Sequence, residues 1–336
     1  MKRKILVITM ITMITMMALA SCGKKKHKND KQNFSKEMES YLSETEEEAP
    51  TSSDNDIVNH TSYGSDYSEC IYNDDGTCSI DYTIDNGDVD VELGVYLFIN
   101  GDMQKYTTEN NNECLFMHCF DVEKKTKKTF KLTFNPIVSK KSEKFYIRVC
   151  NILNPNTIPD SKYFQYGINT YITDGFPKKI SNKNVKVVEK KVSIYKSTEM
   201  SEDKIKEYQY TDDRGNFKDK LSSARFELVE INEEYTNWLK INKDSISCNL
   251  RAMGGMKSNY NIYAFINNRC INEDDAVEFD LEGETSEINE TIEMNFSSMI
   301  DECSINKYNS FSVIACPKDG EEFNSICKTN SVIAMK

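Results

Sequence analysis

Four short sequence blocks occur twice in this 336-residue chain, in the same order. The block YLFIN at 96–100 recurs as YAFIN at 263–267. The other three pairs are TCSI at 77–80 with SCNL at 247–250, TFKLTF at 129–134 with TIEMNF at 291–296, and FYIRVC at 145–150 with FSVIAC at 311–316. A repeat this long predicts two copies of one domain rather than a solenoid of short units.

Each block has the pattern of a β-strand. In TFKLTF, Phe130, Leu132 and Phe134 alternate with polar residues, as on a strand with one buried face. YLFIN and FYIRVC are aromatic and β-branched runs, which are typical of buried strands. Turn-forming residues at 73–76 and 85–87 separate such runs. The sequence therefore predicts an all-β fold of two tandem antiparallel β-sandwiches.

Helical periodicity is scarce in this chain. The best candidates are residues 201–210 and 225–237, and the second segment fits a strand equally well. The alternation of strands and helices that an α/β fold needs is missing.

The N-terminal segment has the features of an export signal. Basic residues at 2–4 precede an apolar run at 5–20, which is short for a permanent membrane span. Leu19, Ala20, Ser21 and Cys22 follow, and here the segment resembles a bacterial lipoprotein signal with its lipobox. The resemblance implies a signal peptide at 1–21 and lipidation of Cys22, with acyl chains such as palmitate. It also implies an extracytoplasmic protein anchored by lipid to the bacterial cell membrane.

The residues that follow Cys22 are polar and highly charged. Low hydrophobicity leaves little to bury, so we expect residues 22–66 to form a disordered, lipid-anchored tether. The repeat then places one sandwich at 67–183 and the other at 184–336.

Ten cysteines remain beyond Cys22, five in each repeat. Two of each five lie in matching blocks, Cys78 and Cys150 in the first repeat and Cys248 and Cys316 in the second. This arrangement resembles the immunoglobulin-type bridge between strands B and F. The resemblance implies an Ig-like fold with Cys78–Cys150 and Cys248–Cys316 disulfides.

The same resemblance implies an aromatic residue packed on each bridge, at Tyr96 or Phe98 and at Tyr263 or Phe265. The usual strand C tryptophan is absent, so no closer kinship is inferred. The other six cysteines show no pairing, and buried thiols remain an alternative to disulfides.

Candidates for chemistry are few. His118 lies between Cys114 and Cys119 in the folded part, whereas His27 and His60 fall in the predicted tether. No second ligand pair accompanies the Cys114–Cys119 segment, so we predict a loop with a disulfide-bonded cysteine and no metal site. The acidic residues Asp85, Asp88, Asp90 and Glu92 lack the spacing of a calcium loop, and we interpret them as a solvated turn. No catalytic or cofactor-binding motif occurs, so no cofactor is predicted.

Net charge restricts the partners. With 42 basic and 54 acidic residues the chain carries −12, which argues against nucleic acid. We predict a non-enzymatic surface binding or adhesion module for an unknown protein or glycan ligand. Most of the 18 tyrosines are expected to be half-buried strand residues, and an exposed tyrosine face is the alternative. Two alternatives remain: a structural or envelope-assembly lipoprotein subunit, and a polysaccharide hydrolase that uses two carboxylates.

Overall fold

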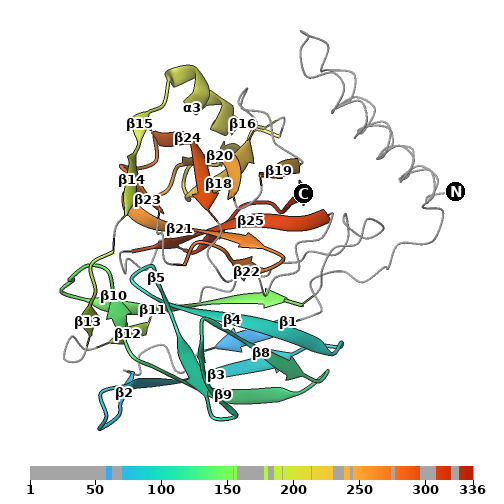
Figure 1. Cartoon of the computed structure of the whole chain (residues 1–336). Helices are drawn as coiled ribbons and strands as arrows, with labels where there is room; N and C mark the ends of the chain where they lie inside the picture. The colour runs from blue at the N-terminus through green and yellow to red at the C-terminus, as the bar shows by residue number, and fades with distance from the viewer. Residues whose placement is uncertain are drawn as a thin grey trace, which may run out of the picture. The chain divides into compact units, whose positions relative to one another are not determined.

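The computed structural model places most of the chain beyond residue 69 in β-strands (Figure 1). It describes residues 58–62, 70–153, 155–156, 178–180, 185–190, 192–212, 214–229, 238–242, 245–273, 277–295, 308–318 and 325–335. Ser52–Lys336 is one compact unit. The predicted signal peptide, Cys22 and the tether up to residue 57 lie outside the described residues. Within the described part, no helix is long and apolar enough to cross a membrane.

Strands between residues 58 and 187 form the first sandwich. Its first sheet has the order β1-β3-β9-β6-β7, with β2 also paired to β3, and its second has the order β12-β11-β4-β5, with β8 also paired to β4. The first sheet contains β1 (Val58–Ser62), β2 (Ile71–Tyr72), β3 (Cys78–Asn86), β6 (Tyr106–Thr108), β7 (Asn111–Leu115) and β9 (Lys127–Phe134). The second contains β4 (Val91–Ile99), β5 (Asp102–Gln104), β8 (Met117–Val122), β11 (Phe145–Leu153) and β12 (Lys178–Ile180). A short parallel pair, β10 (Ile137–Val138) with β13 (Lys186–Val187), lies outside both sheets.

The strand order of the first sandwich is that of an immunoglobulin domain. In chain order, β2, β3, β4, β6, β9, β11 and β12 take the places of strands A to G. Neighbours in one sheet are then A-B-E-D and in the other C-F-G, as in the Ig constant-type sandwich. The inward residues of both sheets form one buried cluster that includes Ile80, Leu132, Leu97 and Val149.

Strands between residues 193 and 335 form the second sandwich, with the order β14-β23-β21-β25-β27-β19-β20-β24-β15. In addition, β18 pairs with β20, β22 with β21, and β26 with β25. One half contains β15 (Thr198–Glu199), β18 (Arg225–Val229), β19 (Trp238–Asn242), β20 (Ser245–Met253) and β24 (Ser286–Asn295). The other contains β14 (Ser193–Lys196), β21 (Ser258–Ile266), β22 (Arg269–Cys270), β23 (Val277–Leu281), β25 (Tyr308–Pro317), β26 (Cys327–Lys328) and β27 (Val332–Met335).

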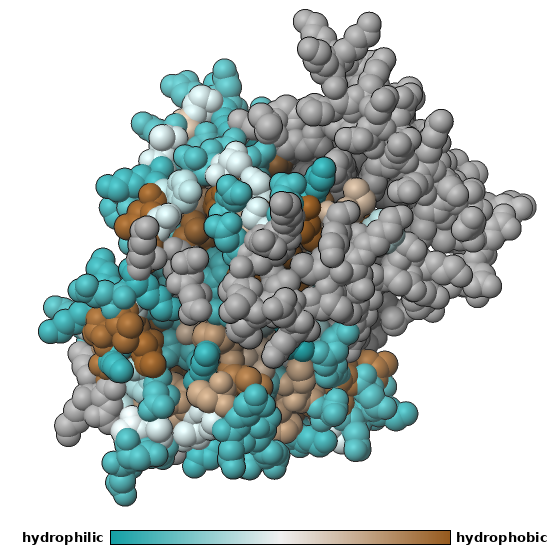
Figure 2. Space-filling view, viewed as in Figure 1, coloured by the Kyte–Doolittle hydropathy of each residue, from teal (hydrophilic) through white to brown (hydrophobic). Residues whose placement is uncertain are grey.

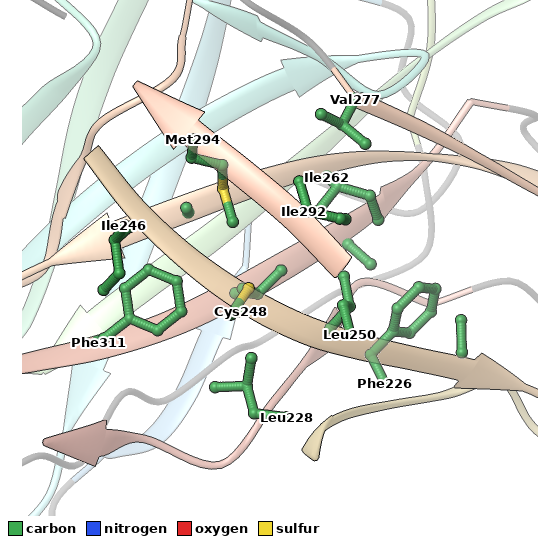
Figure 3. Close-up of a cluster of buried hydrophobic side chains, with 14 of the residues drawn as sticks. Phe226, Leu228, Ile246, Cys248, Leu250, Ile262, Val277, Ile292, Met294 and Phe311 are labelled. Atoms are coloured by element: carbon green, nitrogen blue, oxygen red, sulfur yellow. The ribbon is translucent and has the colours of Figure 1, made fainter. Parts of the chain in front are cut away.

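The pairings of the second sandwich repeat the Ig pattern. Strands β18, β20 and β24 correspond to A-B-E, and β21, β25 and β27 to C-F-G. β19 pairs with both β20 and β27 and so connects the two sheets. Figure 3 shows the core between the two sheets, where Phe226, Leu250, Ile262 and Phe311 lie around Cys248.

The two sandwiches meet through the outer faces of their C-F-G sheets. A third buried cluster joins residues of β4 and β11 to residues of β21, β22 and β25. Its members are Tyr96, Phe98, Met103, Met117, Cys150, Ile152, Tyr263, Phe265, Cys270, Ile314, Cys316 and Ile326. Residues of β4 and β11 are therefore buried on both faces, because one face fills the sandwich core and the other fills this interface.

Matching residues of the two repeats make matching contacts across the interface. The hydroxyl of Tyr96 donates to the carbonyl oxygen of Asn268 at 3.2 Å, and that of Tyr263 donates to Gly101 at 2.9 Å. Tyr96 and Tyr263 begin the repeated YLFIN and YAFIN blocks, and Gly101 and Asn268 follow them directly. Each tyrosine thus caps the hairpin turn of the other sandwich, as in a self-complementary dimer interface.

The structure confirms the predicted all-β class. α3 (Glu202–Tyr208) forms within the predicted helical segment 201–210, whereas Arg225–Val229 is a strand. β1 lies inside the predicted tether. This polar segment forms a strand because its backbone pairs with β3, and backbone pairing does not require hydrophobic side chains. His60 is therefore a strand residue. The predicted boundary at 183 falls before β13, which pairs with β10 of the first repeat.

Candidate functional site

A helix and a hairpin are inserted between β15 and β18. Ser201 caps α3 by accepting the backbone N–H of Lys204 at 3.3 Å, and two acidic residues occupy the first turn of the helix. The hairpin follows at once, with β16 (Gln209–Thr211) paired to β17 (Phe217–Asp219). We call residues 200–221 the hairpin insertion.

The base of the hairpin insertion is fixed to the second sandwich. Met200 and Leu221 form a small buried cluster with Met253 at the end of β20. The amide of Gly255 donates to the carbonyl of Leu221 at 2.8 Å, and a Cβ at Gly255 would lie 2.6 Å from the nitrogen of Ala224. Only glycine allows this close approach at a φ of +76°.

Hydrogen bonds within the turn hold the tip of the hairpin. Asp212 Oδ1 accepts the backbone N–H groups of Arg214 at 3.0 Å and Asn216 at 2.9 Å. The bond from Asn216 is the main reason that the pKa of Asp212 is lowered, so this carboxylate is ionised at neutral pH. Gly215 takes the positive φ of +80° that the turn requires.

The hairpin carries an exposed aromatic residue on each face. Phe217 is 67% exposed and Tyr210 is 39% exposed. Tyr210 lies opposite Lys218, and Phe217 lies opposite Thr211, so the two rings point to opposite sides. Lys220 Nζ lies 5.2 Å from the centre of the Tyr210 ring. A hairpin with two exposed rings, on a fixed base, can bury apolar area in a partner.

A second apolar surface lies on the first sandwich. Ile137, Val187 and Val188 are exposed, and they belong to or adjoin the parallel pair β10–β13. Figure 2 shows this area in brown over β10 and β13. We call these three residues the aliphatic patch.

The predicted disulfides are not present in the structure. Cys78 is buried in the core of the first sandwich, whereas Cys150 belongs to the interface between the sandwiches. In the second sandwich Cys248 lies in the core and Cys316 lies in the interface. Burial raises the pKa of the Cys248 thiol to about 12, which makes it unreactive.

All four cysteines lie on the predicted strands, but Cys150 and Cys316 face away from the sandwich cores. Cys78 and Cys248 lie on strands B, and Cys150 and Cys316 lie on strands F, as the Ig resemblance implied. Alternate residues of a strand point to opposite faces, and Val149 occupies the inward position next to Cys150. The aromatic residues expected on the bridges, Tyr96 and Phe265 among them, accordingly pack in the interface.

His118 has structural contacts. It is buried, its Nε2 lies 2.8 Å from the carbonyl oxygen of Tyr106, and its ring packs on the Tyr106 ring at 4.7 Å between centroids. Cys114 and Cys119 are exposed residues on β7 and β8. Asn156 Nδ2 lies 3.8 Å from Cys119 Sγ.

The acidic residues near the β3–β4 turn have separate partners. Asp85 lies 3.8 Å from Lys127 Nζ, and Asp88 lies 3.0 Å from Lys125 Nζ. Asp90 accepts the backbone N–H of Lys124 at 2.7 Å. Glu92 accepts a hydrogen bond from Asn156 at 2.6 Å. No group of three potential metal ligands occurs among the described residues.

The hairpin insertion is not among the sites predicted from the sequence. A usable signal was present, because residues 212–216 (DDRGN) are turn-forming and lie between short runs that contain Tyr210 and Phe217.

Comparisons with known proteins add little. No protein-family model matches the chain, and no curated protein matches it. Red sea bream transglutaminase aligns over 93% of this chain and 34% of its own length, at 6% identity and a TM-score of 0.21. The chain therefore spans about a third of that structure.

Two further solved structures are similar at the same level. CBD12 from CALX1.2 aligns over 76% of this chain and 79% of its own, at 9% identity and a TM-score of 0.20. The Salmonella enterica SafA pilin in complex with the SafB chaperone aligns over 82% and 96%, at 8% identity and 0.22. TM-scores this low do not establish a shared fold, so the Ig-like assignment rests on the strand order described above.

Proposed function

We propose that this protein is a non-enzymatic binding or adhesion module, held on the outer side of the bacterial cell membrane by lipid on Cys22. The ligand is a protein or a glycan at the cell surface. The hairpin insertion is the contact element, with Phe217 and Tyr210 as its central side chains.

The exposure of Phe217 on a supported hairpin carries this proposal. An isolated two-stranded hairpin is marginally stable in water, and here α3, the Met200–Leu221 cluster and Asp212 support it. Aromatic side chains on such elements become central contacts when a partner buries them. Among the described residues, Phe217 is the most exposed large hydrophobic side chain, and Tyr210 is the other exposed aromatic one.

A binding experiment with two matched variants tests the contact element. The full-length acylated protein in liposomes is presented to a glycan array and to purified surface proteins, and affinity is measured for each ligand that binds. We expect Phe217→Ser to weaken binding at least tenfold with an unchanged unfolding midpoint. Ile194→Ser, which alters an exposed residue on β14, is the control and should bind like the parent protein.

The proposal fails if Phe217→Ser and Tyr210→Ser both bind as tightly as the parent protein. It also fails if no glycan or surface protein binds. Membership of the lipoprotein class has its own test, because Cys22→Ala should release the protein from membranes. The mass of the N-terminal peptide should show acyl chains on Cys22 in the parent protein.

The aliphatic patch favours the second candidate function, a subunit of an envelope assembly. Its three exposed side chains, Ile137, Val187 and Val188, are suited to a permanent protein contact. In that case one membrane protein should co-purify at a fixed ratio, and Val187→Lys should abolish the association while Phe217→Ser leaves it intact.

A further inference from the structure

Cys70 and Cys78 lie together at the start of the first sandwich. Both are buried in the same core cluster. Tyr72 pairs with Cys78 across β2 and β3, so Cys70, two residues earlier, is the diagonal neighbour of Cys78 on the same face. The Cys70 thiol donates to the carbonyl oxygen of Ser79 at 3.3 Å, beside Cys78.

The turn between the two cysteines is fixed by its own hydrogen bonds. Asn73 Nδ2 donates to Thr77 Oγ1 at 2.7 Å and to Ser79 Oγ at 3.0 Å. Asp75 Oδ1 accepts the backbone N–H of Thr77 at 2.9 Å. These bonds hold β2 against β3, so the two cysteines stay close in the folded chain.

We propose that Cys70 and Cys78 form a disulfide that joins β2 to β3 when the protein meets an oxidising compartment. Cys70 lies just before β2 begins, so its backbone is outside the paired strand and can adjust to disulfide geometry. A side-chain hydrogen bond with Cys70 lowers the pKa of the Cys78 thiol, so the two sulfurs lie within hydrogen-bonding reach of each other.

The chemistry is thiol–disulfide exchange with an external disulfide. Both thiols are buried, so the oxidant reaches them when β2 opens from β3. The Cys78 thiolate then attacks one sulfur of the oxidant, forms a mixed disulfide and releases one thiolate. The deprotonated Cys70 sulfur then attacks Cys78 Sγ and releases the second thiolate. The two protein thiols lose two electrons and two protons, and the oxidant is reduced to two thiols.

The bond would strengthen a weak part of the fold. β2 contributes only two residue pairs to the sheet, Ile71 with Ser79 and Tyr72 with Cys78. If the chain is anchored at its N-terminus as proposed above, a pull on the anchor reaches β1 first and β2 next. The disulfide itself is tested without reference to the anchor or to a ligand.

Peptide mapping of the full chain tests the bond. The protein is incubated with oxidised glutathione, remaining thiols are alkylated in denaturant, and the chain is cut before aspartates. We expect fragment 66–73 (DYSECIYN), which contains Cys70, to be linked to fragment 75–80 (DGTCSI), which contains Cys78. Reduction should split the pair.

Two variants make the result specific. Cys70→Ser should remove the linked species and leave Cys78 as a mixed disulfide with glutathione, whereas Cys114→Ser, which alters an exposed cysteine on β7, should leave the linked species unchanged. The proposal is overturned if both Cys70 and Cys78 are alkylated after oxidation. It is equally overturned if Cys78 is linked to any other cysteine.

Discussion

Tyr96 and Phe265 pack edge to face across the interface of the two sandwiches, with ring centroids 5.3 Å apart and planes at 81°. The matching pair, Phe98 with Tyr263, has its centroids 5.6 Å apart. Each pair joins the tyrosine of one repeated block to the phenylalanine of the other. Two copies of the same sequence therefore supply complementary halves of one buried surface.

The interface should contribute strongly to stability. Phe265→Ala removes a fully buried ring, and we expect a loss of about 3–5 kcal/mol in the free energy of unfolding. Phe217→Ala is the control, because its ring is exposed and its loss should cost at most about 0.5 kcal/mol. Urea unfolding of both variants measures the difference. Equal costs would mean that the interface adds nothing to stability.

The ring contact itself can be isolated with a double-mutant cycle. Tyr96→Ala, Phe265→Ala and the double variant should give a coupling energy of at least about 0.5–1.5 kcal/mol. A coupling near zero would contradict the packing of the two rings.

Glycine at 101 should be far less replaceable than glycine at 215. Both have positive φ, +78° and +80°. A Cβ at Gly101 would lie 3.0 Å from the carbonyl oxygen of Cys316, whereas a Cβ at Gly215 would have nothing within 4 Å. Gly215→Ala should cost only the backbone term of about 1–2 kcal/mol. Gly101→Ala should add about 1–3 kcal/mol of steric strain, measurable by urea unfolding. Equal costs would contradict the close approach of the sandwiches at this turn.

The carboxylate of Glu227 should depend on Arg251 more than on Arg225. Both arginines contact it, at 2.6 Å and 3.1 Å, but the Arg251 side chain is 6% exposed and the Arg225 side chain 35%. Arg251→Met leaves a buried charge without its main partner and should cost about 3–5 kcal/mol. Arg225→Met should cost less than about 1 kcal/mol, because water can replace a partly exposed partner. Thermal and urea unfolding measure both costs. A larger cost for Arg225→Met than for Arg251→Met would contradict the prediction.

Lys328 should make stability depend on pH in the alkaline range. Burial lowers the pKa of this lysine to about 8, with Cys150 acting in the opposite direction, and the ordinary value is 10.5. Below pH 8 the lysine is charged in both states and folding bears the full cost of burying that charge. Between pH 8 and 10.5 only the unfolded chain keeps the proton, so the cost decreases as pH rises.

The variant Lys328→Met tests this dependence. It should be more stable than the parent protein at pH 7, and the advantage should shrink towards pH 10.5, as followed by urea unfolding at both values. Lys257→Met is the control, since the ion pair with Glu282 raises the pKa of Lys257 instead. A constant difference between the Lys328 variant and the parent at all pH values would contradict the shift.

Strand positions were predictable because their signals are local. The block at 129–134 shows the alternation of β9, with Leu132 and Phe134 buried, and YLFIN ends β4 at a turn where Asn100 and Gly101 have positive φ. Asn267 and Asn268 repeat that turn. Asparagine and glycine tolerate positive φ, so these residues identify hairpin ends without any tertiary information.

The side on which each strand residue is buried was not predictable in the same way. In FYIRVC, Phe145, Ile147 and Val149 share one face of the strand, and Tyr146, Arg148 and Cys150 share the other. Arg148 marks the Cys150 face as the outer one, but nothing in the pattern indicates that this outer face is buried as well. The strand order places Cys150 on strand F. The second sandwich covers the outer face of that strand, which makes Cys150 an interface residue.

The hairpin insertion depends on tertiary structure to an even greater degree. Aromatic residues such as Phe217 and Phe265 have the same intrinsic preference for strands and for burial, so composition does not separate them. Phe265 is buried because the repeated copy of its own block lies against it. Phe217 is exposed because the pairing of β16 with β17 leaves it outside both sandwiches. Local sequence is sufficient for the strands and turns, whereas burial is a property of two surfaces that only the folded chain brings together.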